Sequence, residues 1–169
     1  MSGKVRSDRG PVVREAVPAD TPAIQQLISG IFGEYGLALV VDGVDEHLAE
    51  PAEYFHAHGG EFWVVEDCER IVATVGGLPH EGDAVELKAL YVHPSIRRQG
   101  WGGRLTTLVM DYARTAGKKR VILWSDTRFT DAHRLYRGLG FRPCGRRDLN
   151  DPYDSSEYGF ECALAADPE

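Results

Sequence analysis

A turn rich in glycine and arginine leads directly into a long amphipathic segment, and this junction limits the possible folds more than any other feature. After Gly102, apolar side chains recur at helical spacing, at Leu105, Leu108, Val109, Tyr112, Ala113 and Ala116. That spacing predicts a helix with one buried face, and Gly117 stands where a helix C-cap belongs. The preceding segment, ELKALYV, is typical of a strand. A strand, a turn and a helix therefore follow one another, as in α/β domains.

The turn has the composition of an anion-binding site. Glycines let the chain approach a ligand closely, and the first amides of a helix lack intrahelical partners and lie at the positive end of its dipole. Three glycines and three arginines share the segment: Arg97, Arg98, Gly100, Gly102, Gly103 and Arg104. A diphosphate fits this design, although glycine-rich turns also precede helices that bind no anion.

Two other phosphate-binding folds fit the turn less well. A P-loop needs a Lys-Ser or Lys-Thr pair after its second glycine, and the turn has none. A dinucleotide-binding fingerprint needs a glycine directly after the strand and another at position 105. Here seven residues separate Val92 from Gly100, and position 105 is leucine. Asp126 partly resembles the ribose-binding acid of such folds, so a dinucleotide-binding oxidoreductase stays as an alternative.

The remaining patterns predict a mixed α/β fold. Runs of β-branched and aromatic residues between 61 and 92 are separated by EDCER and PHEGD, which predicts three antiparallel strands. A helix is expected to open with Asp20 or Thr21 as N-cap and to end near Gly33 or Gly36. A second helix is expected around 45–55, where Pro51 would begin or interrupt it. Further strands are expected at 11–17, 120–125, 141–145 and 157–164, and a helix at 130–140 with Thr130 as N-cap.

Length and composition favour one soluble domain. With 169 residues and 43% hydrophobic content, we expect a single domain at 11–166 after a loose polar tail at 1–10. The sequence has no run near the ~20 apolar residues of a membrane helix and no secretory signal at its start, which predicts a cytoplasmic protein. Cys68, Cys144 and Cys162 match neither zinc nor redox spacing and are expected to be reduced packing residues.

Charge is distributed unevenly along the chain. The net charge is −7, yet 14 Lys or Arg stand against three Asp between Lys88 and Arg147. The negative total argues against general nucleic-acid binding. The basic segment suits a polyanion and the acidic remainder a cationic ligand, unless these charges are simply spread over solvated faces.

Two motifs resemble the GNAT N-acetyltransferase superfamily. Arg97-x-x-Gly100-x-Gly102, between ELKALYVHP and the amphipathic helix, resembles the family's acyl-CoA-binding motif. AHRLYRGLGF, at 132–141, resembles its later helix and strand, and REAVPADTPAIQQLI resembles its first strand and helix more weakly. The resemblance implies a central, mostly antiparallel twisted sheet of six to seven strands with about four helices, with strands splayed at the acyl-CoA site.

The resemblance also implies acetyl-CoA as co-substrate and no metal. Amides from Arg98 to Gly103 would hold the pyrophosphate, and backbone groups at Leu90 and Val92 would pair with the pantetheine arm and polarise the acetyl carbonyl. The implied cofactor-binding residues are Leu90, Tyr91, Val92, Arg97, Arg98, Gln99, Gly100, Trp101, Gly102, Gly103, Arg104 and His133. Many relatives carry an asparagine where this chain has Phe129, so Ser125, Asp126 or Thr127 would have to replace that contact.

Glu86 and Tyr136 are the candidate catalytic residues, because aminolysis of a thioester needs a base for the amine and a proton donor for the thiolate. Glu86 lies eleven residues before Arg97, where family members with a glutamate base place it. Its alternative is a structural pair with Lys88 on one strand face. Tyr136 matches the family tyrosine that protonates the CoA sulfur, and its alternative is core packing.

The sequence predicts an amine acceptor without identifying it. Acidic segments where the family builds its acceptor walls would attract a cationic small-molecule or peptide amine, such as a polyamine, an aminoglycoside, a lysine side chain or a peptide amino terminus. Their carboxylates are Asp42, Asp45, Glu46, Asp151 and Asp154, and solvated surface positions explain them equally well. His47, His56 and His58 match no zinc spacing and are expected on the surface or in loops.

We therefore expect an acyltransferase that moves acetyl from acetyl-CoA to a primary amine by direct attack. The cysteines lie away in sequence from Glu86 and the turn, so a covalent route has no evident nucleophile. The alternative is a non-catalytic acyl-CoA-binding sensor module, and a donor longer than acetyl stays open. A homodimer is expected because family members often pair, and neither nucleic acid nor a membrane is expected as a partner.

Overall fold

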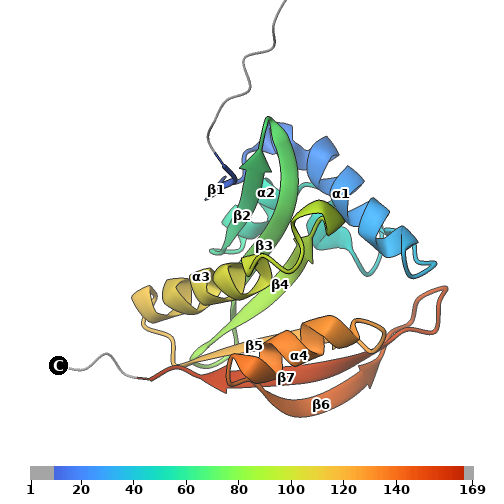
Figure 1. Ribbon diagram of the computed structural model, residues 1–169. Helices are drawn as coiled ribbons and strands as arrows, with labels where there is room; N and C mark the ends of the chain where they lie inside the picture. The colour runs from blue at the N-terminus through green and yellow to red at the C-terminus, as the bar shows by residue number, and fades with distance from the viewer. Residues whose placement is uncertain (1–9, 166–169) are drawn as a thin grey trace, which may run out of the picture.

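The structure is a computed structural model that describes residues 10–165, and these form a seven-stranded sheet with four α-helices (Figure 1). The strands are β1 (Val12–Glu15), β2 (Glu61–Asp67), β3 (Arg70–His80), β4 (Ala84–Val92), β5 (Arg120–Asp126), β6 (Arg142–Asp148) and β7 (Ser156–Ala163). The helices are α1 (Thr21–Gly33), α2 (Pro51–Ala57), α3 (Trp101–Thr115) and α4 (Thr130–Gly138). The expected tail at 1–10 lies outside the described residues, apart from the exposed Gly10, and so does position 166.

The strand order is β1-β2-β3-β4-β5-β7-β6. Within the described chain, β4 and β5 are parallel and the other neighbouring pairs are antiparallel. The predicted mixed α/β fold with a mostly antiparallel sheet is therefore confirmed, including the three successive strands between 61 and 92. The single parallel pair follows from the crossover through α3, which returns the chain to the same end of the sheet.

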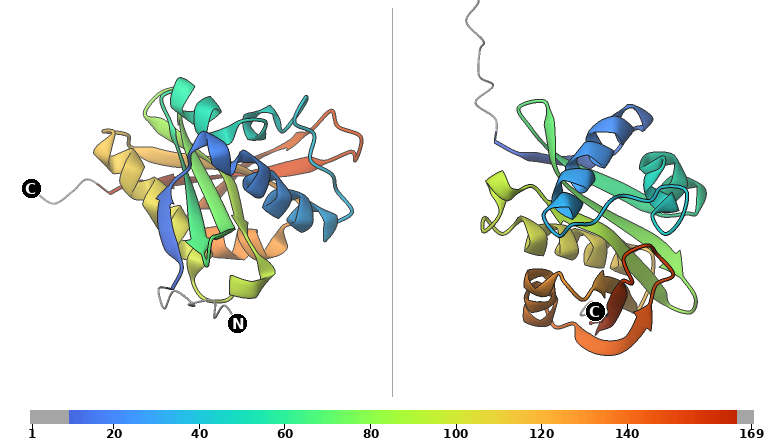
Figure 2. Two further views of the ribbon diagram at one scale, coloured as in Figure 1. Left: turned by 90° about the horizontal axis from the view of Figure 1, so that it is seen from above. Right: turned by 90° about the vertical axis from the view of Figure 1, so that its right-hand side faces the viewer.

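Helices cover both faces of the sheet (Figure 2). The apolar stripe of α3, with Leu105 and Val109 fully buried, packs with α4 against one face. On the opposite face, α1 and α2 bury Ile28 and Phe55 against β2 and β3. The helical periodicities in the sequence thus supply the two apolar layers that enclose the sheet.

Several local expectations hold and others need correction. Pro51 begins α2 rather than interrupting it, and Gly117 follows α3 with a φ of 70°. Thr130 is not the N-cap of α4 but its first residue; the turn before it is held by Asp126, whose carboxylate accepts the Arg128 amide at 2.8 Å. β6 runs beyond the expected 141–145 to Asp148, because it pairs with β7 along its whole length.

The cysteines also differ from expectation. Only Cys162 is buried, whereas Cys68 and Cys144 are exposed and do not serve as core packing residues. Cys68 lies in the tight turn between β2 and β3, and Cys144 lies on the outermost strand β6, so neither position can enclose a side chain. No helix in residues 10–165 is long and apolar enough to cross a membrane.

β4 and β5 pair along only part of their length, and this determines where the site forms. Their register runs from Ala84 opposite Arg120 to Leu87 opposite Leu123, after which β4 continues to Val92 without β5 beside it. A bulge follows at Ala89, which has a φ of 54° and whose carbonyl accepts the Thr74 hydroxyl at 2.8 Å. The predicted splaying of the strands after residue 88 is therefore present.

Candidate functional site

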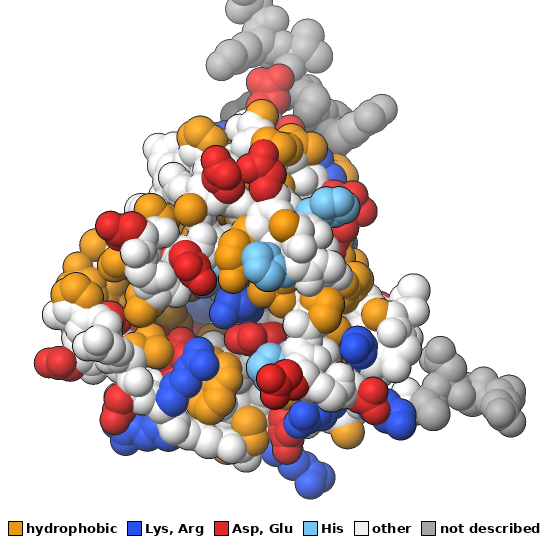
Figure 3. Space-filling model, turned by 180° about the vertical axis from the view of Figure 1, so that it is seen from behind, with side chains coloured by type: hydrophobic (Ala, Val, Ile, Leu, Met, Phe, Trp, Pro, Cys, Tyr) orange, Lys and Arg blue, Asp and Glu red, His pale blue; other side chains and the backbone are white. Residues whose placement is uncertain are grey.

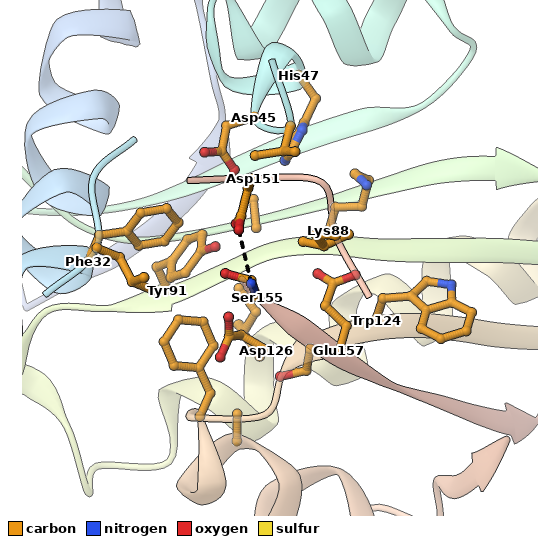
Figure 4. A pocket seen from close by; sticks show the side chains of 18 of the residues that line it. Phe32, Asp45, His47, Lys88, Tyr91, Trp124, Asp126, Asp151, Ser155 and Glu157 are labelled. Carbon is orange, nitrogen blue, oxygen red and sulfur yellow. Dashed lines mark hydrogen bonds between the residues drawn. The ribbon is translucent and has the colours of Figure 1, made fainter. Parts of the chain in front are cut away.

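A cavity of about 340 Å³ lies where β4 and β5 separate. Its wall includes Glu86, Leu90, Tyr91 and Tyr136 from the sequence-predicted site. Figure 3 shows a hollow on the face opposite to that of Figure 1, with acidic and basic side chains around it, and Figure 4 shows the cavity from close by. The gap between the strands joins the two faces of the sheet, because Tyr136 belongs to the α3–α4 core and Tyr91 packs with the α1–α2 core.

The glycine turn forms the start of α3. Gly100 precedes the helix with a φ of 81°, a left-handed conformation that favours glycine, and Arg98 has a φ of 61°. The Arg104 amide donates to the Gly100 carbonyl at 3.0 Å, which is the first hydrogen bond of the helix. The backbone amides before Arg104 therefore have no acceptor within the helix. A 15-residue helix thus presents its positive end at this turn.

Close packing explains one of the glycines. A Cβ on Gly102 would lie 2.8 Å from the Leu135 side chain, whereas a Cβ on Gly103 would meet Leu135 at an ordinary 3.9 Å. Gly102 therefore lets α3 approach α4 closely. Gly103 is free of such a steric requirement, so its lack of a side chain leaves the helix end open to a ligand.

The side chains of the turn do not all face an anion site. Arg97 makes a bidentate ion pair with Glu34 at 2.7 and 2.8 Å and donates to the Val92 carbonyl at 3.0 Å. It therefore fastens the end of β4 to the end of α1. Trp101 is 5% exposed, with the Arg104 guanidinium 4.0 Å above its ring, so its side chain belongs to the core. Arg98 and Gln99 are exposed.

Glu86 lies on the cavity wall between two basic side chains. Its carboxylate accepts a hydrogen bond from Lys88 Nζ at 3.3 Å, and His80 Nδ1 lies 3.8 Å from its other oxygen. The structure thus contains the Glu86–Lys88 pair that was the alternative to a catalytic role, and it also places Glu86 in the cavity with only 16% of its side chain exposed. The two interpretations are compatible.

Tyr136 enters the cavity from α4 with its ring beside Phe141 and Phe160. The residue is 4% exposed, and burial raises the pKa of its hydroxyl above the usual range, so the hydroxyl keeps its proton at neutral pH. His133, one turn earlier on α4, is buried and contacts the Ser125 hydroxyl at 3.1 Å. Burial lowers the pKa of His133 below its usual range.

The cavity therefore gathers part of the predicted site and leaves part outside it. Of the predicted cofactor residues, Leu90 and Tyr91 line the cavity; Val92, the turn from Arg97 to Arg104, and His133 lie outside its lining. Phe129, which stands where many relatives have asparagine, also lines the cavity and packs edge-on against Tyr35 at 4.8 Å between ring centroids. Ser125 and Asp126, the proposed replacements for that asparagine, line it too.

Sequence reasoning did not place four of the cavity residues in the site. His47, expected at the surface or in a loop, lies in the cavity wall, where burial followed by the charge of Lys88 lowers its pKa to about 3. It was missed because its loop carries no periodic pattern. Trp124, Arg147 and Glu157 also line the cavity, the last two joined by a 2.6 Å ion pair. Each of these three lies on a different strand, β5, β6 or β7, so no local pattern links them.

The acidic segments contribute two of their five candidate carboxylates to the cavity. Asp45 and Asp151 line it, whereas Asp42, Glu46 and Asp154 are exposed and lie outside the lining. Both positions come from loops that meet only in the folded chain. Within residues 10–165, His, Cys, Asp and Glu side chains form no group of three or more that could hold a metal ion.

Comparison with known proteins agrees with this architecture. Residues 26–141 match the model of the acetyltransferase (GNAT) family. The chain is 33% identical to the uncharacterized N-acetyltransferase YjgM of Escherichia coli K12 over 138 residues, which cover 79% of this chain and 83% of that protein. It is 35% identical to human N-acetyltransferase 8 over 98 residues, 55% of this chain, and spans under half of that protein's length, 43%.

Solved structures show the same fold. A GNAT-family acetyltransferase from Staphylococcus aureus Mu50 superposes with a TM-score of 0.82 at 20% identity, covering 92% of this chain and all of that one. The Salmonella typhimurium protein yncA, a putative acetyltransferase solved with acetyl-CoA, superposes with a TM-score of 0.72 at 21% identity, covering 95% and 98%. With the motif at the α3 turn, the separated strands and the family match, this chain belongs to the GNAT acetyltransferase family.

Proposed function

We propose that this protein transfers the acetyl group of acetyl-CoA to a primary amine by direct attack. The observation that carries the proposal is the cavity at the β4–β5 gap, whose wall contains both Glu86 from β4 and Tyr136 from α4. Family membership supports an acetyltransferase, and the similar Salmonella protein was solved with acetyl-CoA.

The residues present fit a coenzyme A thioester. The first-turn amides of α3 and the open space at Gly103 suit a diphosphate. The edge of β4 from Lys88 to Val92, which has no β5 beside it, can pair with the amide groups of a pantetheine arm. Acetyl-CoA would supply the acetyl group as a thioester at the end of this edge.

Glu86 would act as the base. An amine arrives largely as an ammonium ion at neutral pH and must lose a proton before its nitrogen can attack a carbonyl carbon. The Glu86 carboxylate can accept that proton directly or through water, and its contact with Lys88 orients it. The C–N bond forms as the C–S bond breaks, and Tyr136 would give its hydroxyl proton to the departing thiolate.

A covalent acyl-enzyme is not part of the proposal. None of the three cysteines lines the cavity, and Cys162, on β7, is buried in the α3–α4 core. Direct attack therefore needs no further side chain than those already in the cavity wall.

Calorimetric titration with acetyl-CoA, with NADH and ATP as controls, is the first test. We expect selective micromolar binding of acetyl-CoA, followed by amine-dependent release of CoA thiol across a panel of primary amines. Glu86→Gln should lower kcat/KM by about 10²-fold or more. Preference for NADH or ATP would contradict the proposal. Tight acetyl-CoA binding with no amine-dependent release, and no effect of Glu86→Gln on any measured property, would instead support an acyl-CoA sensor.

A further inference from the structure

The cavity wall is strongly acidic on the side of the two loops. Asp45 comes from the loop after α1, and Asp151 comes from the loop between β6 and β7 (Figure 4). With three carboxylates on strands, the lining contains five acidic and two basic side chains. The acidic ones are Asp45, Glu86, Asp126, Asp151 and Glu157, and the basic ones are Lys88 and Arg147. The cavity therefore favours a positively charged ligand.

Three of these carboxylates already have cationic partners, and two do not. Glu86 pairs with Lys88 at 3.3 Å, Asp126 with Arg128 at 3.3 Å, and Glu157 with Arg147 at 2.6 Å; the lysine and both arginines are thereby neutralised. Among the ion pairs of residues 10–165, neither Asp45 nor Asp151 has a partner within 4.0 Å. These two charges remain for a ligand to balance.

Each of the two aspartates uses one oxygen to hold its own loop. Asp45 Oδ2 accepts the Val40 amide at 2.9 Å, and Asp151 Oδ1 accepts the amides of Tyr153 and Ser155 at 3.1 and 2.9 Å. In the described part of the chain, no buried side-chain oxygen lacks a hydrogen bond, so the second oxygen of each carboxylate is accessible. Burial raises the pKa of Asp45 above its usual range. The hydrogen bond from the Val40 amide lowers this pKa in part, and the negative charge of Asp151 raises it further.

An independent feature of the same cavity is a tyrosine hydroxyl without a protein partner. Tyr136 is only 4% exposed, yet its hydroxyl makes no hydrogen bond within residues 10–165 and faces the cavity. Since no fully buried side-chain oxygen of the described residues lacks a hydrogen bond, this hydroxyl is open to the cavity, where a bound molecule can supply its partner. His47 adds no positive charge to the wall at neutral pH, because its pKa is lowered to about 3 by burial.

We infer that the acceptor is a small molecule with at least two ammonium groups, of which one is acetylated near Glu86 and Tyr136 while the other stays charged between Asp45 and Asp151. This inference rests on the proposed function, since it assigns the substrate class of the same cavity. The second ammonium would donate hydrogen bonds to the two accessible oxygens and would fix the distance at which the reacting amine enters.

The test compares aliphatic α,ω-diamines with monoamines of the same chain length in the CoA-release assay. Asp45→Asn and Asp151→Asn remove the charge but keep an oxygen that can accept the loop amides, so the loops should retain their structure. We expect the unmodified protein to prefer diamines, and each substitution to lower the diamine-to-monoamine ratio of kcat/KM by about 10-fold or more, mainly through KM. Asp42→Asn, at an exposed carboxylate of the same loop outside the cavity, should leave this ratio unchanged.

Calorimetric titration of a diamine into the protein saturated with CoA gives a second readout that does not depend on turnover. Equal turnover of diamines and monoamines, or a ratio unaffected by both substitutions, would overturn the inference while leaving the proposed function intact. Absence of acetyl-CoA binding and of release with any amine would overturn the proposed function itself. An aminoglycoside is included in the same panel, so that its rate of CoA release can be compared with that of the aliphatic diamines. The comparison shows which of the two carries the ammonium groups that the cavity accepts.

Discussion

At the scale of single residues, the site depends on polar groups whose protein partners are incomplete. Tyr136 brings an unpaired hydroxyl into the cavity, and Asp45 and Asp151 each bring a carboxylate with no cation. Arg97, in contrast, is fully engaged by Glu34 and the Val92 carbonyl. The residues with unused capacity are therefore the ones expected to act on a ligand, and the engaged arginine is expected to support the loop that carries the turn.

Tyr136→Phe should separate catalysis from cofactor binding. The hydroxyl makes no hydrogen bond within the described chain, so its removal leaves the ring packing with Phe141 and Phe160 intact. We expect kcat to fall by about 10²-fold or more while the Kd for acetyl-CoA changes by less than about 3-fold. Steady-state kinetics measures kcat, and calorimetry measures the Kd. If acetyl-CoA affinity fell by the same factor as kcat, Tyr136 would have a packing role only.

His47 should make the folded state sensitive to acid. The unfolded chain binds a proton on this imidazole below about pH 6.5, whereas burial holds the folded pKa near 3. The unfolded state thus binds more protons between these values, and the free energy of unfolding falls as pH decreases, by at most about 1.4 kcal/mol per pH unit.

Urea unfolding at pH 7.5 and pH 5 measures this dependence. The loss of stability between the two pH values should be smaller in His47→Gln than in the unmodified protein, and His56→Gln, at an exposed histidine, should behave like the unmodified protein. An identical pH dependence in all three proteins would show that His47 is not the group responsible.

At the scale of elements, two features create the site. α3 begins at a left-handed glycine and presents its free amides, and β4 continues past the end of its pairing with β5 through a bulge at Ala89. The first feature suits a diphosphate and the second leaves a strand edge for an extended ligand. Because β4 leads directly to the turn, one segment of chain positions both.

Gly103→Asp should abolish acetyl-CoA binding without weakening the fold. A Cβ at this position makes only ordinary contact with Leu135, and the helix dipole stabilises a carboxylate in the first turn. The same carboxylate would repel a diphosphate, so we expect the Kd to rise by about 10²-fold or more. Gly102→Asp is the poorer test, because its Cβ would lie 2.8 Å from Leu135.

Gly30→Asp is the matched control, since a Cβ on this exposed glycine of α1 meets no atom within 4 Å. Calorimetry with acetyl-CoA and thermal unfolding of both variants give affinity and stability. Unchanged affinity in Gly103→Asp would remove the turn from the cofactor site.

At the scale of the whole molecule, one sheet separates two apolar cores, and the cavity lies where two of its strands separate. α3 and α4 enclose one core, and α1, α2 and the loop before α2 enclose the other. Phe55 is fully buried in the second core, 4.9 Å from Phe62 between ring centroids, and a Cβ on Gly76 would overlap its ring. This core supports the loop that carries Asp45 and His47.

Phe55→Ala should therefore lower the free energy of unfolding by about 3–5 kcal/mol, because it removes a buried ring and leaves a cavity that the surrounding side chains do not fill. Because the sheet is shared by both cores, unfolding should stay a single transition when followed by tryptophan fluorescence and by circular dichroism. Val12→Ala, at a side chain that is 54% exposed, should change stability by less than about 0.5 kcal/mol. Two separate transitions in Phe55→Ala would mean that the cores unfold independently.

The sequence by itself determined the elements whose signals are local. The 3.6-residue spacing after Gly102 predicted α3, the turn-like segments between β2, β3 and β4 predicted the antiparallel strands, and the glycine motif indicated the GNAT family. These signals depend on backbone geometry within a few residues, so they can be read without knowing the fold. Glu86, Leu90, Tyr91 and Tyr136 were predicted on such motifs and all line the cavity.

Only the tertiary structure decided which loop residues meet. His47, Asp45 and Asp151 lie in segments with no periodic pattern, and the fold brings the segment before α2 and the β6–β7 loop to one cavity. The pairing of Arg97 with Glu34 spans 63 positions and likewise has no local signal. Contacts between distant segments depend on how the sheet and helices close on each other. The cofactor motif and the acidic segments could therefore be read from the chain, whereas only the fold shows which of the candidate carboxylates reach the cavity.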